Sequence, residues 1–252
     1  MDNNSTNSTT SPSAESDGFR SAPTAPLLAR RALRHYSHHL LDLTPGPDRL
    51  FKGLRESTRR NIRNAANEGV TVRFAGDLEA VKSYYRLHCL TRKRHGVPPQ
   101  PFSFFGNLQQ HLIATGQGFV ALADYQGKAI AGAVFLTFGD RAIFKFGASD
   151  SLYHSVRPNN LVMWEAIRRL AEDGLRTLSF GRTDLGHTGL VQFKSGWGAS
   201  ENVSLYTRFD FETQGYIRNN GNAHPLYVKV FQQFPVPILK VFGNLFYKHF
   251  GA

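Results

Sequence analysis

Only one cysteine, Cys89, occurs among the 252 residues, which excludes a disulfide framework and a zinc site built from cysteines. The ten histidines show no metal-binding spacing such as HExxH, so we expect no metal site. No apolar run reaches the length that spans a bilayer, and no basic stretch followed by an apolar one opens the chain. These absences are typical of a protein from a reducing compartment, and we expect it in the cytoplasm.

Large apolar side chains are also scarce in residues 1–26, which are rich in Ser, Thr and Asn. Such a segment cannot offset its ordering entropy by burial, so we predict a disordered tail over residues 1–26. The composition changes abruptly near Leu27, and residues 27–212 are predicted to form one folded domain. With 41% hydrophobic and 12% aromatic residues overall, the chain can bury a core of ordinary size.

Acidic residues are outnumbered in this chain. There are 30 Lys and Arg against 19 Asp and Glu, which gives a formal net charge of +11. This charge favours a polyanionic partner, which could be tRNA, a nucleotide-phosphate substrate or an anionic membrane face. The charge alone does not choose among the three.

The C-terminal extension, residues 213–252, contains no Asp or Glu and interleaves aromatic side chains with lysines. One interpretation is a pair of short helices that cover the core and are interrupted at Pro235 and Pro237. The other is a basic amphipathic segment that lies on an anionic membrane.

The spacing of apolar residues predicts alternating helices and strands. Strands are predicted over residues 38–43, 70–74, 118–125, 128–139, 141–150, 175–181 and 203–211. Helices are predicted over residues 48–68, 77–96, 102–115 and 158–173. The three strands between residues 118 and 150 are joined by tight turns and should form an antiparallel meander. The order of elements predicts an α/β fold with a mixed sheet.

Two arginines in the first long helix are candidates for phosphate recognition. Arg59 and Arg63 lie one helical turn apart on one stripe of the segment ESTRRNIRNAANEGV. Guanidinium groups offer bidentate donor forks that suit phosphate oxygens. A solvated basic face explains the same pattern without any ligand.

The segment SFGRTDLGHTGLVQFKSGWGA, residues 179–199, carries the strongest candidates for chemistry. Lys194 stands between apolar and glycine neighbours, where its ammonium costs desolvation unless its charge is used. An ammonium held there could stabilise the oxyanion that forms when an amine attacks an ester or thioester. Arg182 could hold a substrate phosphate, and Asp184 could accept a proton or orient the amine. The alternative is that Arg182 pairs with Asp184 while Lys194 reaches the surface.

Five motifs, taken in order, resemble the FemAB-like family of Fem-type aminoacyl transferases. They are RRNIRNAANEGV, LHCLTRKRHGVPPQPFSFF, FKFGASD, RPNNLVMWEAIR and the segment 179–199, and they cover roughly residues 38–212. The resemblance implies a GNAT-like fold, in which a mixed, largely antiparallel central sheet is flanked by helices. It also implies acyl transfer, in the best-known members of an amino acid from aminoacyl-tRNA to an amine of a nucleotide- or lipid-linked peptidoglycan precursor.

By this resemblance, Lys194 of the FKSGWG segment matches the lysine that steadies the tRNA ester during attack. Trp197 of the same segment is then expected to contact substrate. The phosphate roles of Arg59, Arg63 and Arg182 extend the comparison to a tRNA or nucleotide partner.

The sequence departs from the family pattern in two respects. Fem-type enzymes carry two GNAT-like domains, whereas this sequence offers room for one, so a partner domain or a homo-oligomer is expected. Acetyl-CoA-using GNAT proteins grip pyrophosphate with a glycine turn that opens a helix. Here Asn159 and Asn160 stand where glycines would be, which argues against CoA; we expect the two asparagines to contact substrate and no cofactor to be needed.

Two other functions stay open. One is a CoA-dependent N-acyltransferase that modifies exopolysaccharide or lipid, with acyl-CoA as its donor. The other is a non-catalytic module that binds an anionic membrane or a nucleic acid.

Overall fold

The computed structural model describes residues 34–184, 188–207, 209–212, 214–216 and 225–250. The tail predicted over residues 1–26 lies outside the described residues. A seven-stranded sheet forms the centre, with the strand order β2-β3-β4-β5-β6-β1-β7. The strands are β1 (Arg34–Asp42), β2 (Thr71–Ala75), β3 (Gly118–Tyr125), β4 (Lys128–Phe138), β5 (Arg141–Ser149), β6 (Thr177–Asp184) and β7 (Ser200–Tyr206). The pair β5–β6 is parallel and all other neighbours in this sheet are antiparallel, so the predicted mixed, largely antiparallel sheet is confirmed.

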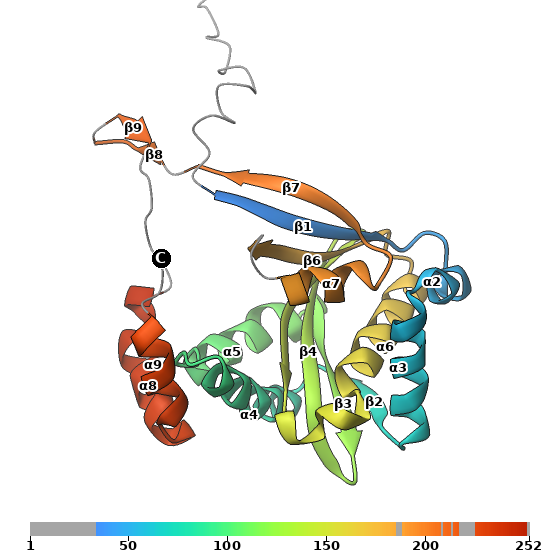
Figure 1. Ribbon diagram of the computed structural model, residues 1–252, viewed down its shortest axis with the longest axis horizontal. Coiled ribbons are helices and arrows are strands. Elements are labelled where there is room, and N and C mark those ends of the chain that lie inside the picture. Colours follow the sequence, from blue (N-terminus) through green and yellow to red (C-terminus); the bar gives the residue numbers. More distant parts are fainter. Residues whose placement is uncertain (1–33, 185–187, 208, 213, 217–224, 251–252) are drawn as a thin grey trace, which may run out of the picture.

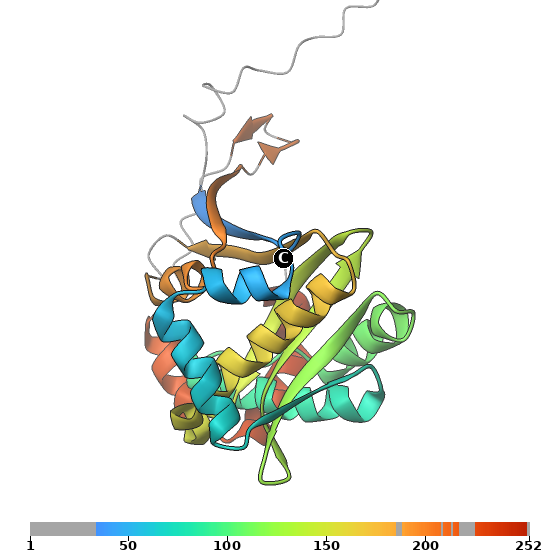
Figure 2. The same ribbon diagram turned by 90° about the vertical axis from the view of Figure 1, so that its right-hand side faces the viewer.

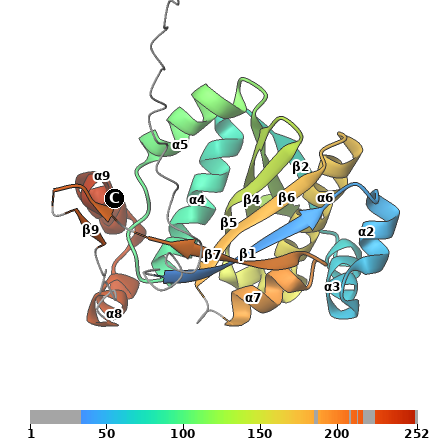
Figure 3. The same cartoon turned by 90° about the horizontal axis from the view of Figure 1, so that it is seen from above.

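Helices cover both faces of the sheet (Figures 1 and 3). The helical elements are α2 (Pro47–Gly53), α3 (Glu56–Asn67), α4 (Leu78–Arg94), α5 (Phe102–Leu108), the π-helix η1 (Gln109–Ile113), the 3-10 helix η2 (Ser151–Val156), α6 (Pro158–Glu172), α7 (Thr188–Ser195), α8 (Pro225–Gln233) and α9 (Val236–Phe250). Helices α3 and α6 pack side by side on one face (Figure 2), and α4 and α5 pack on the other. A short hairpin of β8 (Phe209–Asp210) and β9 (Gly215–Tyr216) lies beyond β7.

The core lies in two layers, one on each side of the sheet. Phe135 of β4 is fully buried, and its ring stacks on Phe119 at 5.3 Å and contacts the tilted ring of Phe144 at 5.6 Å. Burying an aromatic side chain of this size contributes roughly 1.5–3 kcal/mol. The opposite layer contains His88, whose ring is buried and bonded to Gln100 at 2.6 Å. Burial lowers the pKa of His88 to about 4, so this histidine is a neutral core residue.

The predicted helix over residues 48–68 is wrong at its centre, because the chain turns at Leu54. Leu54 adopts an extended conformation and its side chain enters the core, with 3% exposed. The N–H of Arg55 then donates to the carbonyl of Gly196 at 3.1 Å instead of continuing the helix. The result is two helices, α2 and α3, with α3 beginning against the segment that follows α7.

Other boundaries also differ from the prediction. The last predicted strand, residues 203–211, is divided into β7 and β8, and the predicted helix over residues 102–115 changes to a π-helix after Leu108. The predicted loop after Arg182 contains the helix α7.

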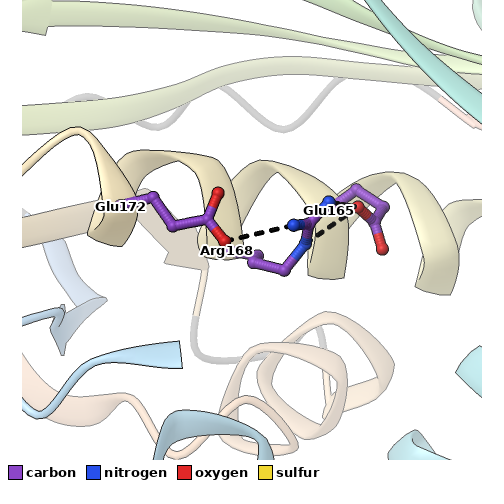
Figure 4. Close-up of polar contacts among 3 residues, drawn as sticks. All are labelled: Glu165, Arg168 and Glu172. Atoms are coloured by element: carbon purple, nitrogen blue, oxygen red, sulfur yellow. Dashed lines mark hydrogen bonds and ion pairs between the residues drawn. The ribbon is translucent and has the colours of Figure 1, made fainter. Parts of the chain in front are cut away.

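Helix α6 lies across the sheet and keeps a charged outer face. Arg168 donates to Glu165 at 2.6 Å and to Glu172 at 3.1 Å, one turn away on either side (Figure 4). Such exposed pairs contribute only about 0.2–0.5 kcal/mol each. The position of α6 therefore depends on its apolar face, which is buried from Leu161 to Leu170.

Helices α8 and α9 pack on α4 and on the segment that joins α4 to α5 (Figure 3). The contact is close at Gly243, where an added Cβ would lie 2.0 Å from the carbonyl oxygen of Pro99. Pro237 lies in the first turn of α9, where a missing N–H is tolerated. Pro235, between the two helices, is thus the point where the helical extension bends.

Candidate active site

The parallel strands β5 and β6 separate part of the way along their length. They pair at Arg141–Thr177, Ala142–Leu178 and Ile143–Ser179 and not beyond, although both strands continue for several residues. A parallel pair that stops in this way leaves a V-shaped opening between two strands of one sheet. Side chains of β5 and β6 beyond their last pair are therefore candidates for a site.

A cavity of about 260 Å³ lies against the part of β5 that follows its last pair with β6, and α4, α6 and α7 surround it. Phe144, Gly147 and Ser149 of β5 form one wall. Helix α6 contributes Asn159 and Met163 from its first turns, and α7 closes the cavity with Leu190 and Phe193. The lining is mainly apolar, with a few polar groups at one end, which is typical of a small-molecule site.

The polar end of the cavity is organised around Ser149, which is buried. The Ser149 hydroxyl bonds to His154 at 2.8 Å and accepts a bond from the amide of Asn159 at 3.3 Å. The Thr91 hydroxyl donates to the Ser149 carbonyl and accepts from its N–H. Arg94 adds a cation 3.4 Å from the same carbonyl. These groups place a fixed set of donors beside the beginning of α6.

Lys194, at the end of α7, lies against the part of β6 that is no longer paired with β5. Its side chain is buried, with 2% exposed, and its ammonium donates to the carbonyls of Gly181 at 2.9 Å and Arg182 at 3.4 Å. Successive carbonyls of a regular strand point in opposite directions. Here β6 has an irregular register opposite His39, and Gly181 has φ +68°, a conformation that favours glycine. The bulge turns both carbonyls toward the lysine.

Burial disfavours the charged form of Lys194. Desolvation by burial lowers the pKa of Lys194 from its ordinary 10.5 to about 8. An ammonium has three N–H donors, and two are used by Gly181 and Arg182. The third has no acceptor among the residues that the structure describes, so it can serve a substrate oxygen.

A buried polar group on β1 lies next to Lys194. His39 is fully buried, and its ring nitrogens lie 3.5 Å from the Ser195 hydroxyl and 3.4 Å from the Ser37 hydroxyl. Ser37 in turn donates to the Glu201 carboxylate. The pKa of His39 lies below its ordinary value, mainly because the ring is buried. The Glu201 carboxylate opposes this shift, and the Lys194 ammonium adds to it. His39 is therefore a neutral ring that links the lysine helix to the edge strand β7.

Arg182 and Asp184 do not pair with each other in the described part of the chain. The guanidinium of Arg182 lies over the rings of Tyr36 and Tyr206, 4.9 Å from the centre of each, and these two rings contact each other edge to face. Stacking of this kind fixes the plane of the group while its N–H edges stay exposed. Asp184 is exposed at the end of β6. Both side chains lie on the strand whose carbonyls bind Lys194.

The other predicted residues lie in different places. Arg59 bonds to the Lys52 carbonyl at 2.6 Å and pairs with Glu56, and the exposed Arg63 lies over the ring of Phe51. Neither lines the cavity. Both are on α3, which begins against Gly196 just after the lysine helix.

Trp197 lies in the core, with 1% exposed, and its ring packs against Phe193 at 5.7 Å. Its indole N–H has no acceptor in the described part of the chain. Asn159 lines the cavity, whereas the backbone N–H of Asn160 donates to the Arg157 carbonyl at 3.1 Å. The structure thus brings Asn159 to the cavity and Trp197 behind its wall.

Several groups of the site were not identified from the sequence. They are Thr91, Arg94, Ser149, His154 and His39. Thr91, Arg94 and Ser149 lie within the motifs quoted above but were given no role, and they meet His154 only because α4, β5 and η2 converge. His39 stands next to His38 in one strand, so a signal existed, but only the strand register decides which ring points inward.

Known proteins resemble this chain in sequence and in fold. The family model described as Acetyltransferase (GNAT) domain matches residues 52–195, which include the cavity and Lys194. The lipid II:glycine glycyltransferases of Staphylococcus haemolyticus (strain JCSC1435) and Staphylococcus epidermidis (strain ATCC 12228 / FDA PCI 1200) are each 32% identical over 78 and 79 residues, 29% of this chain. The match spans only 19% of the length of these relatives.

Solved structures show a similar fold. FemX superposes with a TM-score of 0.61 at 18% identity, over 66% of this chain and 59% of that chain. L-PGS from Bacillus licheniformis superposes with a TM-score of 0.50 at 11% identity, over 83% of this chain and 68% of that chain. At such identities the likeness concerns the fold alone.

Proposed function

Because this chain belongs to the GNAT acetyltransferase domain family, in a FemAB-like form, we propose that it transfers an aminoacyl group from aminoacyl-tRNA to an amine of a cell-envelope precursor. The acceptor in this proposal is a lipid- or nucleotide-linked peptidoglycan precursor. Its support is the similarity to lipid II:glycine glycyltransferases, which extends over part of the chain. The high positive charge, +11, suits both a tRNA and a phosphate-bearing acceptor.

The observation that carries the proposal is the place of Lys194. Its ammonium is buried 2.9 Å from the Gly181 carbonyl, two residues past the last β5–β6 pair, on the helix whose Leu190 and Phe193 line the cavity. A desolvated cation fixed in this way interacts strongly with a charge that develops beside it. Attack of an amine on an ester develops such a charge on the carbonyl oxygen.

In the proposed reaction the amine nitrogen bonds to the ester carbonyl carbon and a negative charge forms on its oxygen. Lys194 donates its remaining N–H to that oxygen. The ester C–O bond then breaks, and the ribose hydroxyl leaves with one proton that originates from the amine. Asp184 is the proposed group that orients the amine and relays this proton, and Arg182 is proposed to hold a substrate phosphate.

Acyl-CoA is the competing donor, because the family model describes an acetyltransferase domain. The first turn of α6 fits a pyrophosphate less well than a glycine turn does. Arg157 takes the left-handed conformation there, with φ 54°, and its carbonyl already accepts the N–H of Asn160. The proposed reaction therefore does not use CoA, and acyl-CoA is the alternative donor that a binding experiment distinguishes.

Donor choice can be measured directly. Binding of the protein to aminoacyl-tRNA, uncharged tRNA and acetyl-CoA is compared at physiological salt, since a protein of charge +11 holds any nucleic acid at low ionic strength. We expect tighter binding of charged than of uncharged tRNA. Binding of acetyl-CoA alone would favour an N-acyltransferase that modifies lipid or exopolysaccharide, and equal binding of both tRNAs would favour a non-catalytic module.

The pH dependence of transfer gives a prediction with a definite sign. Burial lowers the pKa of Lys194 to about 8, so the charged form is lost as the pH rises through that value. If the ammonium stabilises the oxyanion, the single-turnover rate should fall about tenfold per pH unit above pH 8. The residual rate of Lys194→Met should lack this alkaline limb. A wild-type rate that rises through pH 8, after correction for spontaneous ester hydrolysis, would contradict the role of the ammonium.

A further inference from the structure

The solvent-facing side of α9 is apolar. Ile238 is 43% exposed, Val241 57% and Leu245 60%. Their spacing of three and four residues places them on one stripe of the helix. Val230, on the neighbouring helix α8, is 52% exposed. We call these four side chains the α8–α9 stripe.

The opposite side of α9 is already packed. Leu239 is 1% exposed, and Gly243 meets the backbone of Pro99. Between the helices, the ring of Phe242 stacks on that of Phe234 at 6.0 Å and meets that of Phe231 edge to face at 5.8 Å. Helix α9 is therefore apolar on both its inner and outer sides, which is typical of a helix that is covered on both. The α8–α9 stripe requires a second partner.

Lys229 and Lys240 lie on the same two helices as the stripe, and acidic residues are absent from the sequence after Glu212. A second cavity, of about 410 Å³, opens between α4 and α9 and is lined by Lys82, Arg86 and Lys240. The Lys240 ammonium lies 5.2 Å from the centre of the Tyr85 ring in the wall of this cavity. Lys82 also pairs with Glu79 at 2.6 Å, and Arg86 donates to the Ala129 carbonyl. Each of the three cations keeps donors that can serve a phosphate group.

We propose that the α8–α9 hairpin is a docking surface for a membrane of anionic phospholipids. The α8–α9 stripe enters the boundary between headgroups and acyl chains, and the cavity with Lys82, Arg86 and Lys240 takes a lipid phosphate. The argument rests on the exposed stripe and its charge, and it does not depend on the proposed acyl transfer. No helix in the described part of the chain has the length and apolarity to cross a bilayer, so the contact is with the membrane surface.

Two other occupants fit the observations less well. A second copy of the chain, paired through the same face, would bring Lys229 and Lys240 of both copies together without a neutralising acid from residues 213–252. Single-stranded RNA is held by cations and by stacking on exposed aromatic rings. The four side chains of the stripe are aliphatic, and the neighbouring ring of Phe246, 43% exposed, is already stacked on Phe242 at 6.0 Å. A surface with anionic headgroups and acyl chains matches both the charge and the apolar side chains.

The test is flotation of the full chain with vesicles of phosphatidylcholine, with and without phosphatidylglycerol, at physiological salt. We expect at least tenfold stronger binding to the anionic vesicles. The variant Val241→Ser with Leu245→Ser should lose at least tenfold of that binding with no change in net charge. The matched control is Phe138→Ser with Leu152→Ser, which removes side chains that are 85% and 82% exposed elsewhere. The control should bind as the wild type does.

Contribution of the cavity is tested separately. Lys82→Gln with Lys240→Gln should reduce the preference for anionic over neutral vesicles, whereas Lys52→Gln with Lys145→Gln, which removes the same charge elsewhere, should change it less. Equal effects of the two charge variants would overturn the role of the cavity. Melting temperatures of all variants are measured so that unfolding is not mistaken for lost binding.

Insertion of the stripe into a membrane can also be measured with a fluorescent label, which leaves most of the stripe unchanged. Cys89 is the single cysteine of the chain and is 1% exposed, so Leu245→Cys can be labelled selectively with an environment-sensitive dye. Its emission should shift to the blue on anionic vesicles, and that of Phe138→Cys should not. The absence of a blue shift for the label at residue 245 would overturn the proposal. So would a Val241→Ser, Leu245→Ser variant that still binds vesicles but has lost an oligomer or the binding of RNA.

Discussion

Replacing Lys194 with methionine is expected to lower the single-turnover rate of acyl transfer by about 10²–10³-fold, the usual cost of removing one oxyanion donor. Methionine keeps the length and most of the volume of the side chain but has no N–H. The loss should appear in the rate of the chemical step, and the affinity for the acyl donor should change little, because the interaction strengthens only as the oxyanion forms.

The Lys194→Met variant also removes a buried charge and leaves the carbonyls of Gly181 and Arg182 without their donor. These two effects on stability oppose each other, so the melting temperature must be measured beside the rate. Lys52→Met, which removes an exposed lysine from α2, is the control and should transfer at the wild-type rate. A Lys194→Met rate within threefold of the wild type would exclude an oxyanion role for this lysine.

Replacing Trp197 with alanine should lower the free energy of unfolding by about 3–5 kcal/mol, as for other large side chains removed from a core. The indole is 1% exposed and packs against Phe193, which forms part of the cavity wall. Trp197→Phe should cost much less, because it keeps an aromatic ring and removes an N–H that has no acceptor in the described part of the chain. Denaturation with urea measures both changes.

Activity of Trp197→Phe separates two roles for this residue. If Trp197 acts by packing behind the cavity, the phenylalanine variant should keep most of the wild-type transfer rate. If the sequence-based expectation of a substrate contact holds, Trp197→Phe should raise the apparent KM strongly while its stability stays near that of the wild type.

The sheet and its main helices were predictable from sequence because their signals are local. Apolar segments joined by tight turns indicate β3, β4 and β5, and Asp77 caps α4 by accepting the N–H of Ala80 at 2.7 Å. Each of these signals is complete within a few neighbouring residues. The family resemblance then added the expectation of a mixed, largely antiparallel central sheet flanked by helices.

Helix α7 was not predictable, although it carries Lys194. Its sequence contains Thr188 and Gly189 at the start and ends before Gly196, and such residues favour loops when considered alone. The helix is stabilised by its contacts with β1 and β6 (Figure 1). The same holds for the setting of Lys194: the sequence indicated a desolvated lysine, but its two carbonyl acceptors depend on a bulge at Gly181.

The cavity could not be predicted from the sequence, for a related reason. It exists because the β5–β6 pairing ends at Ile143–Ser179, which is a property of two strands that are far apart in the chain. The inward orientation of His39 follows from the alternation of β1 and its unbroken pairing with β7, which also connects distant parts of the chain.

The most direct test of the account is transfer of a labelled amino acid from aminoacyl-tRNA to a lipid-linked or nucleotide-linked peptidoglycan precursor. The reaction is run beside the same acceptors with labelled acetyl-CoA, and both are repeated with Lys194→Met. The account predicts label on the amine of the precursor from aminoacyl-tRNA and a reduction of about 10²–10³-fold in the variant. Label from acetyl-CoA alone, or equal rates in the two proteins, would contradict it.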